Sequence, residues 1–293
     1  MDLIERAAAR LAQQENKTSK TEAENVVDAR EEAPPRPVAV LHRSEEHGLP
    51  LLKLDEERLR QAGMVVPDST RSKIKEEYRH IKRPLLMNAA GKGTSVLKHA
   101  NLIMVTSSHP GEGKTFTAAN LALSIAAERD KTVLLVDADV VRPSLGALLG
   151  FSAEKGLVDH LIDPTLDLGD LLIKTELPTL TILPAGTPHH LSTELLASTA
   201  MQQLTEQLSS RYRDRIVIFD SPPLLPTTES CVLAHLMGQI VIVVEAERTT
   251  RSDVRESLER LGALPETAVG FVLNKTRHEM DPGYYGYGYG YGY

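Results

Sequence analysis

The stretch from residue 102 to residue 115, Leu102-Ile-Met-Val-Thr-Ser-Ser-His-Pro-Gly-Glu-Gly-Lys-Thr115, decides the fold of this 293-residue chain. The apolar run Leu102–Thr106 predicts a buried strand. The loop Ser108–Thr115 follows it, and a helical pattern covers Lys114–Glu128. A glycine-rich loop between a strand and a helix is the context of a phosphate-binding loop. We therefore expect a nucleotide site here.

The residue types of this loop suit phosphate and magnesium. Glycines let backbone N–H groups approach phosphate oxygens, and the helix N-terminus adds partial positive charge. Lys114 should reach the β- and γ-phosphates, and the Thr115 hydroxyl should ligate Mg²⁺. Ser108 stands where the usual pattern has glycine, which is a mild change. We predict ATP and Mg²⁺ as cofactors, with nucleotide contacts from Pro110, Gly111, Glu112, Gly113, Lys114, Thr115, Phe116 and Asn274.

Further apolar runs predict a sheet around this loop. They lie at Thr132–Asp137, Leu180–Pro184, Arg215–Asp220, Gln239–Glu245 and Ala268–Asn274, with helical patterns at Ser69–Leu86, Ser192–Arg211 and Ser252–Leu261. Continuous runs of Val, Ile and Leu with helices between them indicate strands buried on both faces. The fold class is therefore α/β, with a doubly wound, mostly parallel sheet flanked by helices. Ligands of such sheets bind beyond the carboxyl ends of the strands.

Carboxylates follow two of these strands. Asp137 and Asp139 end one strand, and Asp220 ends another. Such oxygens suit Mg²⁺, and Asp139 is our candidate for the base that accepts a hydroxyl proton. Aspartates also cap helices and form turns, but three of them at strand ends near a phosphate loop favour a site. The predicted catalytic residues are Lys114, Asp137, Asp139 and Asp220, and the predicted metal ligands are Thr115, Asp137 and Asp220.

Asn274 ends the last predicted strand. Resemblance to P-loop proteins, which have an asparagine at this place, implies a contact with the base of the nucleotide. An asparagine there can equally be a simple cap. Both interpretations stay open.

The last ten residues contain six of the eight tyrosines, in alternation with glycine. Such a tail cannot pack a core, because glycine raises the entropy cost of order and no aliphatic side chains are present. One interpretation is an adhesive interaction segment. The nucleotide site upstream favours the other, a strip of phosphate acceptors, made up of Tyr284, Tyr285, Tyr287, Tyr289, Tyr291 and Tyr293.

Composition excludes some functions. The net charge of −7 provides no basic field for nucleic acid. No window approaches the length of a membrane span, and the N-terminal residues lack the apolar stretch of a signal peptide. We expect a cytoplasmic protein that a partner recruits to the inner face of the membrane.

Three regions are predicted. Residues 1–68 form a largely flexible extension, in which a short amphipathic helix at residues 2–14 docks either on its own domain or on a partner. Residues 69–278 form the nucleotide domain, and residues 279–293 form the tyrosine-rich tail.

The chain resembles the bacterial tyrosine kinases (BY-kinases) of polysaccharide export, which are related to the MinD and ParA ATPases. The resemblance rests on Pro110–Thr115, on Leu134–Asp139 with Arg142 and Pro143, on Ile218–Pro223 and on the tyrosine cluster. It covers about residues 70–293. The stretch Glu76–Leu86 and the Tyr-Gly tail are most similar to the stand-alone autokinases of exosortase (PEP-CTERM) exopolysaccharide loci.

The resemblance implies a mechanism and partners. Subunits assemble in a ring through a helix that carries Glu76, Arg79 and Lys82, and the tail of one subunit is phosphorylated in trans by its neighbour. The resulting cycle of ring assembly and disassembly would regulate exopolysaccharide synthesis or export. A separate transmembrane chain-length regulator activates the kinase, a tyrosine phosphatase resets it, and nucleic acid has no part.

Two alternatives remain. The first is a MinD/ParA-like ATPase switch that recruits a partner, with the tail as an interaction segment. MinD-type ATPases carry a lysine where this chain has His109, and they lack a tyrosine tail, so both differences favour the kinase. The second is a scaffold that binds nucleotide without catalysis, which the intact Asp137, Asp139 and Asp220 disfavour.

Overall fold

The fold is built on one mixed sheet. The computed structural model describes residues 42–43, 50–68, 70–93, 96–211 and 214–276. The strands that it describes lie in the order β1-β2-β5-β6-β4-β7-β3-β8-β9. The six from β6 to β9 in that order run parallel, whereas β5 pairs antiparallel with β6. Their bounds are β1 His42–Arg43, β2 Pro50–Leu52, β3 Leu102–Ser107, β4 Thr132–Asp137, β5 Ile173–Thr175, β6 Leu180–Leu183, β7 Arg215–Asp220, β8 Gln239–Glu245 and β9 Ala268–Asn274.

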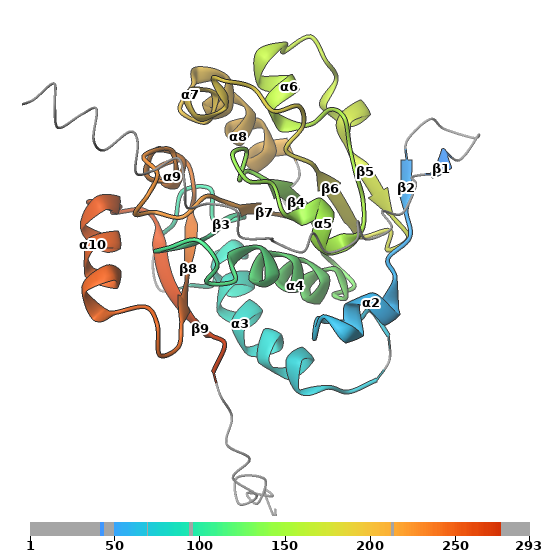
Figure 1. The fold of residues 1–293 in the computed structure, drawn as a ribbon, viewed down its shortest axis with the longest axis horizontal. Coiled ribbons are helices and arrows are strands. Elements are labelled where there is room, and N and C mark those ends of the chain that lie inside the picture. Colours follow the sequence, from blue (N-terminus) through green and yellow to red (C-terminus); the bar gives the residue numbers. More distant parts are fainter. Residues whose placement is uncertain (1–41, 44–49, 69, 94–95, 212–213, 277–293) are drawn as a thin grey trace, which may run out of the picture. The chain divides into compact units, whose positions relative to one another are not determined.

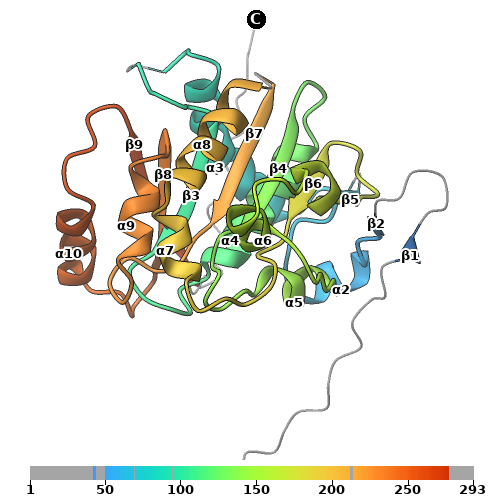
Figure 2. The ribbon, with the colours of Figure 1, turned by 90° about the horizontal axis from the view of Figure 1, so that it is seen from above.

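Helices cover both faces of the sheet, which confirms the predicted fold class. Figure 1 shows α3 and α4 on one side of the central strands and α7 and α8 on the other, and Figure 2 shows the same elements turned by 90°. The helices are α2 Glu56–Gln61, α3 Lys73–Ala89, α4 Lys114–Ala126, α5 Leu145–Leu149, α6 Leu157–Ile162, the 3₁₀ turn η1 Leu168–Leu171, α7 Ser192–Leu196, α8 Thr199–Arg211, α9 Glu229–Ala234 and α10 Arg251–Leu261.

The central strands divide their side chains between two apolar clusters. On β3, Ile103 and Val105 belong to the cluster that contains α4, whereas Leu102 and Met104 belong to the cluster that contains α8. All four are fully buried. Alternate residues of a strand point to opposite faces, so a strand covered on both faces must be apolar throughout. This is the physical origin of the continuous apolar runs in the sequence.

The predicted strands match the observed ones to within one residue, but two predicted helices differ. The helical pattern over residues 192–211 divides into α7 and α8. The helix predicted from Ser69 begins at Lys73, because the Ser72 side chain caps it by accepting from the backbone N–H of Lys75. It also ends at Ala89 instead of Leu86, and α3 packs Leu85 and Ala89 against the core.

The structure moves the predicted boundary of the nucleotide domain. Residues 50–68 were assigned to the flexible extension, yet β2 pairs with β5, and Leu52 and Leu59 are buried in the core. The backbone N–H of Val65 donates to Oδ1 of Asn120 on α4 at 2.6 Å. Burial of these apolar side chains ties the segment to the domain. The predicted helix at residues 2–14 and the tyrosine tail lie outside the described residues.

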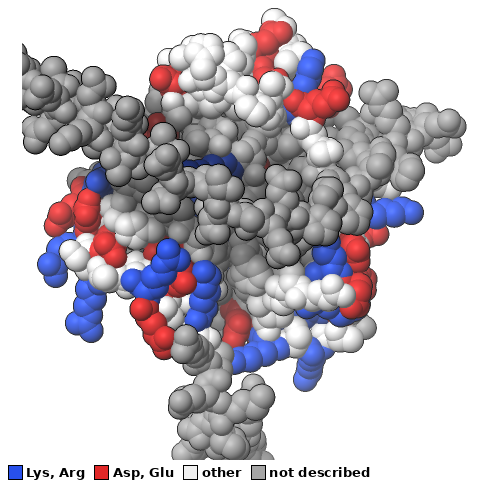
Figure 3. Space-filling model, viewed as in Figure 1, with Lys and Arg blue, Asp and Glu red and all other residues white. Residues whose placement is uncertain are grey.

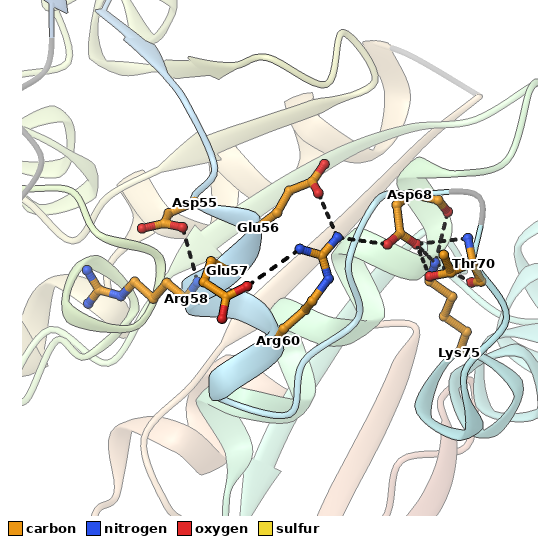
Figure 4. A network of polar contacts seen from close by, with 8 residues as sticks. All are labelled: Asp55, Glu56, Glu57, Arg58, Arg60, Asp68, Thr70 and Lys75. Atoms are coloured by element: carbon orange, nitrogen blue, oxygen red, sulfur yellow. Dashed lines mark hydrogen bonds and ion pairs between the residues drawn. The ribbon is translucent and has the colours of Figure 1, made fainter.

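A polar network joins α2 to the start of α3 (Figure 4). Arg60 on α2 bridges Glu56 and Asp68, with Nη2 2.9 Å and 3.0 Å from their carboxylates. Asp68 also accepts from Thr70 and from Lys75. The hydrogen bond from Lys75 is the main reason that the pKa of Asp68 lies far below its ordinary value. The network fixes the connection that brings α3 onto α4.

Two surface properties bear on partners. On the face drawn in Figure 3, positive and negative side chains of the described residues are interspersed. Within the described ranges, no helix combines the length and the apolarity that crossing a bilayer requires.

Leu59→Ala should lower the free energy of unfolding by about 2–5 kcal/mol, since it removes a buried side chain from the core. Urea unfolding followed by circular dichroism measures this loss. Glu57→Ala on the same helix is the matched control, and its exposed side chain should change stability by less than about 0.5 kcal/mol. Equal stability of both variants would contradict the inclusion of residues 50–68 in the folded domain.

Candidate active site

The predicted site residues meet at the carboxyl ends of neighbouring strands. The loop Ser108–Thr115 follows β3, and Asn274 ends β9. Asp137 and Asp220 end β4 and β7, which are adjacent, and the two residues are register partners. Since these strands are parallel and in register, their ends deliver the loop and both carboxylates to one place.

Two glycines give the loop its shape. Gly111 and Gly113 have φ values of 85° and 99°, in the region that favours glycine. A Cβ on Gly113 would lie 2.1 Å from Nδ2 of Asn274, so no other residue fits there. That Nδ2 donates to the carbonyl of Glu112 at 2.9 Å. Asn274 therefore supports the loop directly, whatever it contributes to nucleotide binding.

Buried side chains hold the loop from behind. Glu112 is 1% exposed, and its carboxylate accepts from the backbone N–H of His109 at 2.9 Å and from the Thr249 hydroxyl. Any nucleotide contact of Glu112 must therefore come from its backbone. The Ser108 hydroxyl lies 2.8 Å from that of Ser257 on α10. A serine in place of the usual glycine thus links the loop to α10. No motif in the sequence identified Thr249 or Ser257, because only the fold brings them to the loop.

Lys114 lies among carboxylates. Its Nζ donates to Oδ2 of Asp139 at 2.5 Å and is 4.0 Å from Oδ1 of Asp220. Burial lowers the pKa of Lys114, but Asp220 and Asp139 outweigh burial and raise it above its ordinary value. The amine therefore stays charged. Asp139 is held on its other oxygen by the backbone N–H of Arg142, at 3.2 Å.

Two carboxylates of the site are buried without full pairing. Within the described residues, Oδ1 of Asp137 and both carboxylate oxygens of Asp220 accept no hydrogen bond. Burial raises the pKa of Asp137 to about 8, reinforced by repulsion from Asp220 and Asp139. Burial likewise raises the pKa of Asp220 to about 6, against the opposing effect of Lys114. Unpaired buried carboxylates are costly, so the arrangement calls for a cation.

The donor set fits Mg²⁺ bound together with phosphate. The described residues contain no cluster of three or more His, Cys, Asp or Glu side chains that could hold a metal ion. Mg²⁺ commonly takes only one or two carboxylates and completes its shell with water and phosphate oxygens. Asp137, Asp220 and the Thr115 hydroxyl, which lies 2.8 Å from Oγ of Ser144, meet that requirement. These are the residues that would hold the ion.

A cavity of about 410 Å³ opens beside the phosphate-loop residues Pro110, Gly111 and Lys114. Lys114 and Asp139 line it, as do the exposed Val141 and Arg142 and the prolines Pro222 and Pro223. The cavity therefore combines charged groups with apolar walls. Phe116, predicted as a nucleotide contact, instead packs its partly buried ring against the core.

The predicted subunit-contact residues divide into two kinds. Glu76 and Arg79 pair with each other on the exposed side of α3. Lys82 is 6% exposed; its Nζ donates to the carbonyl of Ser124 at 2.6 Å and lies 2.6 Å from a carboxylate oxygen of Glu128. The structure corrects the assignment of Lys82 to a subunit contact, because this amine is used inside the domain. The predicted acceptor tyrosines lie outside the described residues.

Comparisons with known proteins agree with this geometry. The ParA family, described as NUBPL iron-transfer P-loop NTPase, matches residues 98–282. Tyrosine-protein kinase CpsD of Streptococcus agalactiae is 31% identical over 194 residues, 64% of this chain and 83% of CpsD. Tyrosine-protein kinase YwqD of Bacillus subtilis is 28% identical over 77% of this chain and 92% of YwqD.

Two further comparisons cover a longer relative and a solved structure. Succinoglycan biosynthesis transport protein ExoP of Rhizobium meliloti is 36% identical over 72% of this chain, which spans 26% of the length of ExoP. The crystal structure of the chimerical protein CapA2B2 superposes with a TM-score of 0.61 and 26% identity, covering 76% of this chain and all of that one.

The fold and the site define a ParA-type P-loop NTPase domain. Within that class, the chain belongs to the family of bacterial tyrosine kinases. Both the resemblance and the enzyme class predicted from the sequence are confirmed at the level of the family.

Asp137→Asn should stabilise the metal-free, nucleotide-free protein, and more at about pH 8 than at about pH 5. The folded protein keeps a proton on Asp137 up to about pH 8, whereas the unfolded chain releases it near the ordinary aspartate pKa of 3.8. The free energy of unfolding of the wild type therefore falls as pH rises from about 4 to about 8. The variant does not show this fall, because asparagine carries no titratable proton. Melting temperatures in a chelator measure the effect.

The exposed Asp130→Asn is the control for this experiment. It should follow the wild type at both pH values. A melting temperature of Asp137→Asn that drops relative to wild type as pH rises would contradict the burial of a strained carboxylate.

Proposed function

We propose that this chain is an ATP-dependent tyrosine autokinase that phosphorylates its own C-terminal tyrosines in trans and thereby regulates exopolysaccharide synthesis or export. One observation carries the proposal: Lys114, Asp139 and the incompletely paired Asp137 and Asp220 lie together beside a glycine-rich loop. A chain with this site ends in six closely spaced phenols. The polysaccharide role rests on relatives such as ExoP, named for succinoglycan biosynthesis and transport.

The contacts of Lys114 suggest how the site works. In the structure, Nζ of Lys114 donates a hydrogen bond to Oδ2 of Asp139. Phosphate oxygens of ATP would draw the amine away, because they offer more negative charge. Asp139 would then be free to accept the phenol proton, while Lys114 and the loop N–H groups stabilise charge on the transferring phosphoryl group. Bound magnesium would neutralise phosphate charge beside Asp137 and Asp220.

The surface of α3 supports assembly into a ring. Glu76, Arg79 and Arg83 line a cavity of about 420 Å³, together with the exposed Met87. Because Lys82 makes its contacts inside the domain, we assign its predicted role in the subunit contact to the exposed Arg83. Each phosphate on the tail adds about −1.5 to −2 charges, which should loosen a ring of acidic subunits.

The partners we propose follow from the family. A separate transmembrane chain-length regulator activates the kinase and recruits it from the cytoplasm to the inner face of the membrane, and a tyrosine phosphatase reverses the reaction. The Tyr-Gly tail supports our proposal that the chain is one of the stand-alone autokinases of exosortase loci.

The match to the ParA family favours a second candidate, an ATPase switch that recruits a partner in its ATP-bound state. In that case the tail is an interaction segment and phosphate leaves to water. Hydrolysis of ATP without phosphotyrosine would identify it.

Phosphatase-treated protein incubated with Mg-ATP should gain a ladder of phosphate masses, up to the six tail tyrosines. Intact-mass spectrometry measures the ladder. Lys114→Ala should lose it because the phosphate-binding amine is gone, and a chain ending at Asp281 should lose it because the acceptors are gone. A wild-type protein that hydrolyses ATP but gains no mass, even with the cytoplasmic segment of its membrane partner, would favour the switch.

Arg79→Ala should shift the unphosphorylated protein toward smaller species in mass photometry and leave its melting temperature nearly unchanged. Arg79 is exposed, whereas Lys82 holds α3 to α4. Lys82→Ala should therefore lower the melting temperature first. Arg83→Ala should resemble Arg79→Ala. The account fails on this point if Arg79→Ala and Arg83→Ala leave the size distribution of the wild type unchanged.

A further inference from the structure

Strand β9 ends the sheet with an exposed apolar stripe. Among the described strands, β9 pairs only with β8. Val269, Phe271 and Leu273 alternate along it and are 38%, 51% and 62% exposed. An edge strand with free backbone groups and exposed apolar side chains is a template for a further strand, and proteins normally protect such edges. Some segment should cover this one.

The stripe lies on the face that carries α10. Val269 and Phe271 are register partners of Ile240 and Ile242 on β8, which belong to the apolar cluster on that face. Yet α10 buries only Ser257 and Leu261 along its length. The helix between β8 and β9 therefore leaves the apolar face of β9 open, within the part of the chain that the structure describes.

The chain itself supplies a segment of matching pattern. Tyr285 and the four tyrosines at positions 287–293 alternate with glycine, so an extended tail would place all five phenol rings on one face. Ten residues, 275–284, separate this segment from β9, which ends at Asn274. They contain Asp281-Pro282-Gly283, a sequence typical of a turn. A reversal there would bring the tail back along β9.

We propose that the unphosphorylated tail adds to β9 as an antiparallel edge strand, with its tyrosine rings packed on Val269, Phe271 and Leu273. Residues directly opposite in an antiparallel pair share a face, so the tail glycines would lie opposite Gly270 and Val272. The short connection gives the tail a high effective concentration at β9, which favours it over a second copy or a separate partner.

Docking would hold the tyrosines away from a kinase site, so phosphoryl transfer would take place only on tails that have left β9. A phosphate beside Phe271 must stay hydrated, so each transfer would weaken the docked state. Unphosphorylated tails would then stay docked on β9, and phosphorylated tails would be released from it. The inference goes beyond the proposed kinase activity, and docking itself needs no phosphate transfer.

Hydrogen exchange of the full-length, unphosphorylated protein without nucleotide tests this proposal. The amides of β9 should exchange about tenfold more slowly in wild type than in Phe271→Ser, because the docked tail protects them. A second variant keeps the tail composition but exchanges Tyr287 with Gly288 and Tyr291 with Gly292. It breaks the alternation far from the folded core and should lose the same protection.

Val232→Ser is the matched control, since Val232 is a similarly exposed apolar side chain (43%) on α9. It should exchange like wild type. Autophosphorylated protein, where it forms, should also lose protection at β9. Equal exchange of β9 in wild type and in the rearranged tail would overturn the proposal, and protection that falls on dilution but ignores the tail would assign β9 to a second copy. Both readouts hold whether or not the protein is a kinase.

Discussion

The structure depends on one costly arrangement, the burial of Asp137 and Asp220 side by side with a single lysine near them. Both carboxylates are almost fully buried, and their pKa values are raised because charge is unfavourable there. A purely structural protein gains nothing from such a pair. The pair becomes favourable once a cation and phosphate enter, so part of the folding free energy is withheld until nucleotide binds. The parallel register of β4 and β7 fixes this arrangement.

The rest of the domain keeps the phosphate loop in register with these carboxylates. Glu112 and Asn274 hold the loop through buried hydrogen bonds, and Ser108 joins it to α10. Residues 50–68 cover the far side of α4, whose N-terminus carries Lys114. The contact between Lys114 and Asp139 then links the state of the proposed base to the presence of phosphate. In the proposed mechanism, one amine binds phosphate and otherwise pairs with the candidate base.

Much of the site could be predicted because its residues follow continuous apolar strands. Such runs mark strand ends, and strand ends of a parallel sheet meet at one edge. Asp137, Asp139, Asp220 and Lys114 were found in this way. The contacts of Lys82 could not be predicted, because only packing of α3 on α4 shows that its amine reaches Ser124. The short strands β2 and β5 also could not be predicted, because a strand of three residues shows no measurable hydrophobic periodicity.

The central claim is phosphoryl transfer from this site to the tail of another subunit. An experiment that mixes two variants tests it most directly. A chain ending at Asp281 retains the site but has no acceptors, and Lys114→Ala retains the tail but lacks the phosphate-binding amine. When the two are combined with Mg-ATP, the account predicts that phosphate masses appear on the Lys114→Ala chain only. If neither chain gains mass in the mixture while full-length wild type does, transfer does not take place in trans. If wild type also gains none, the site is not that of an autokinase.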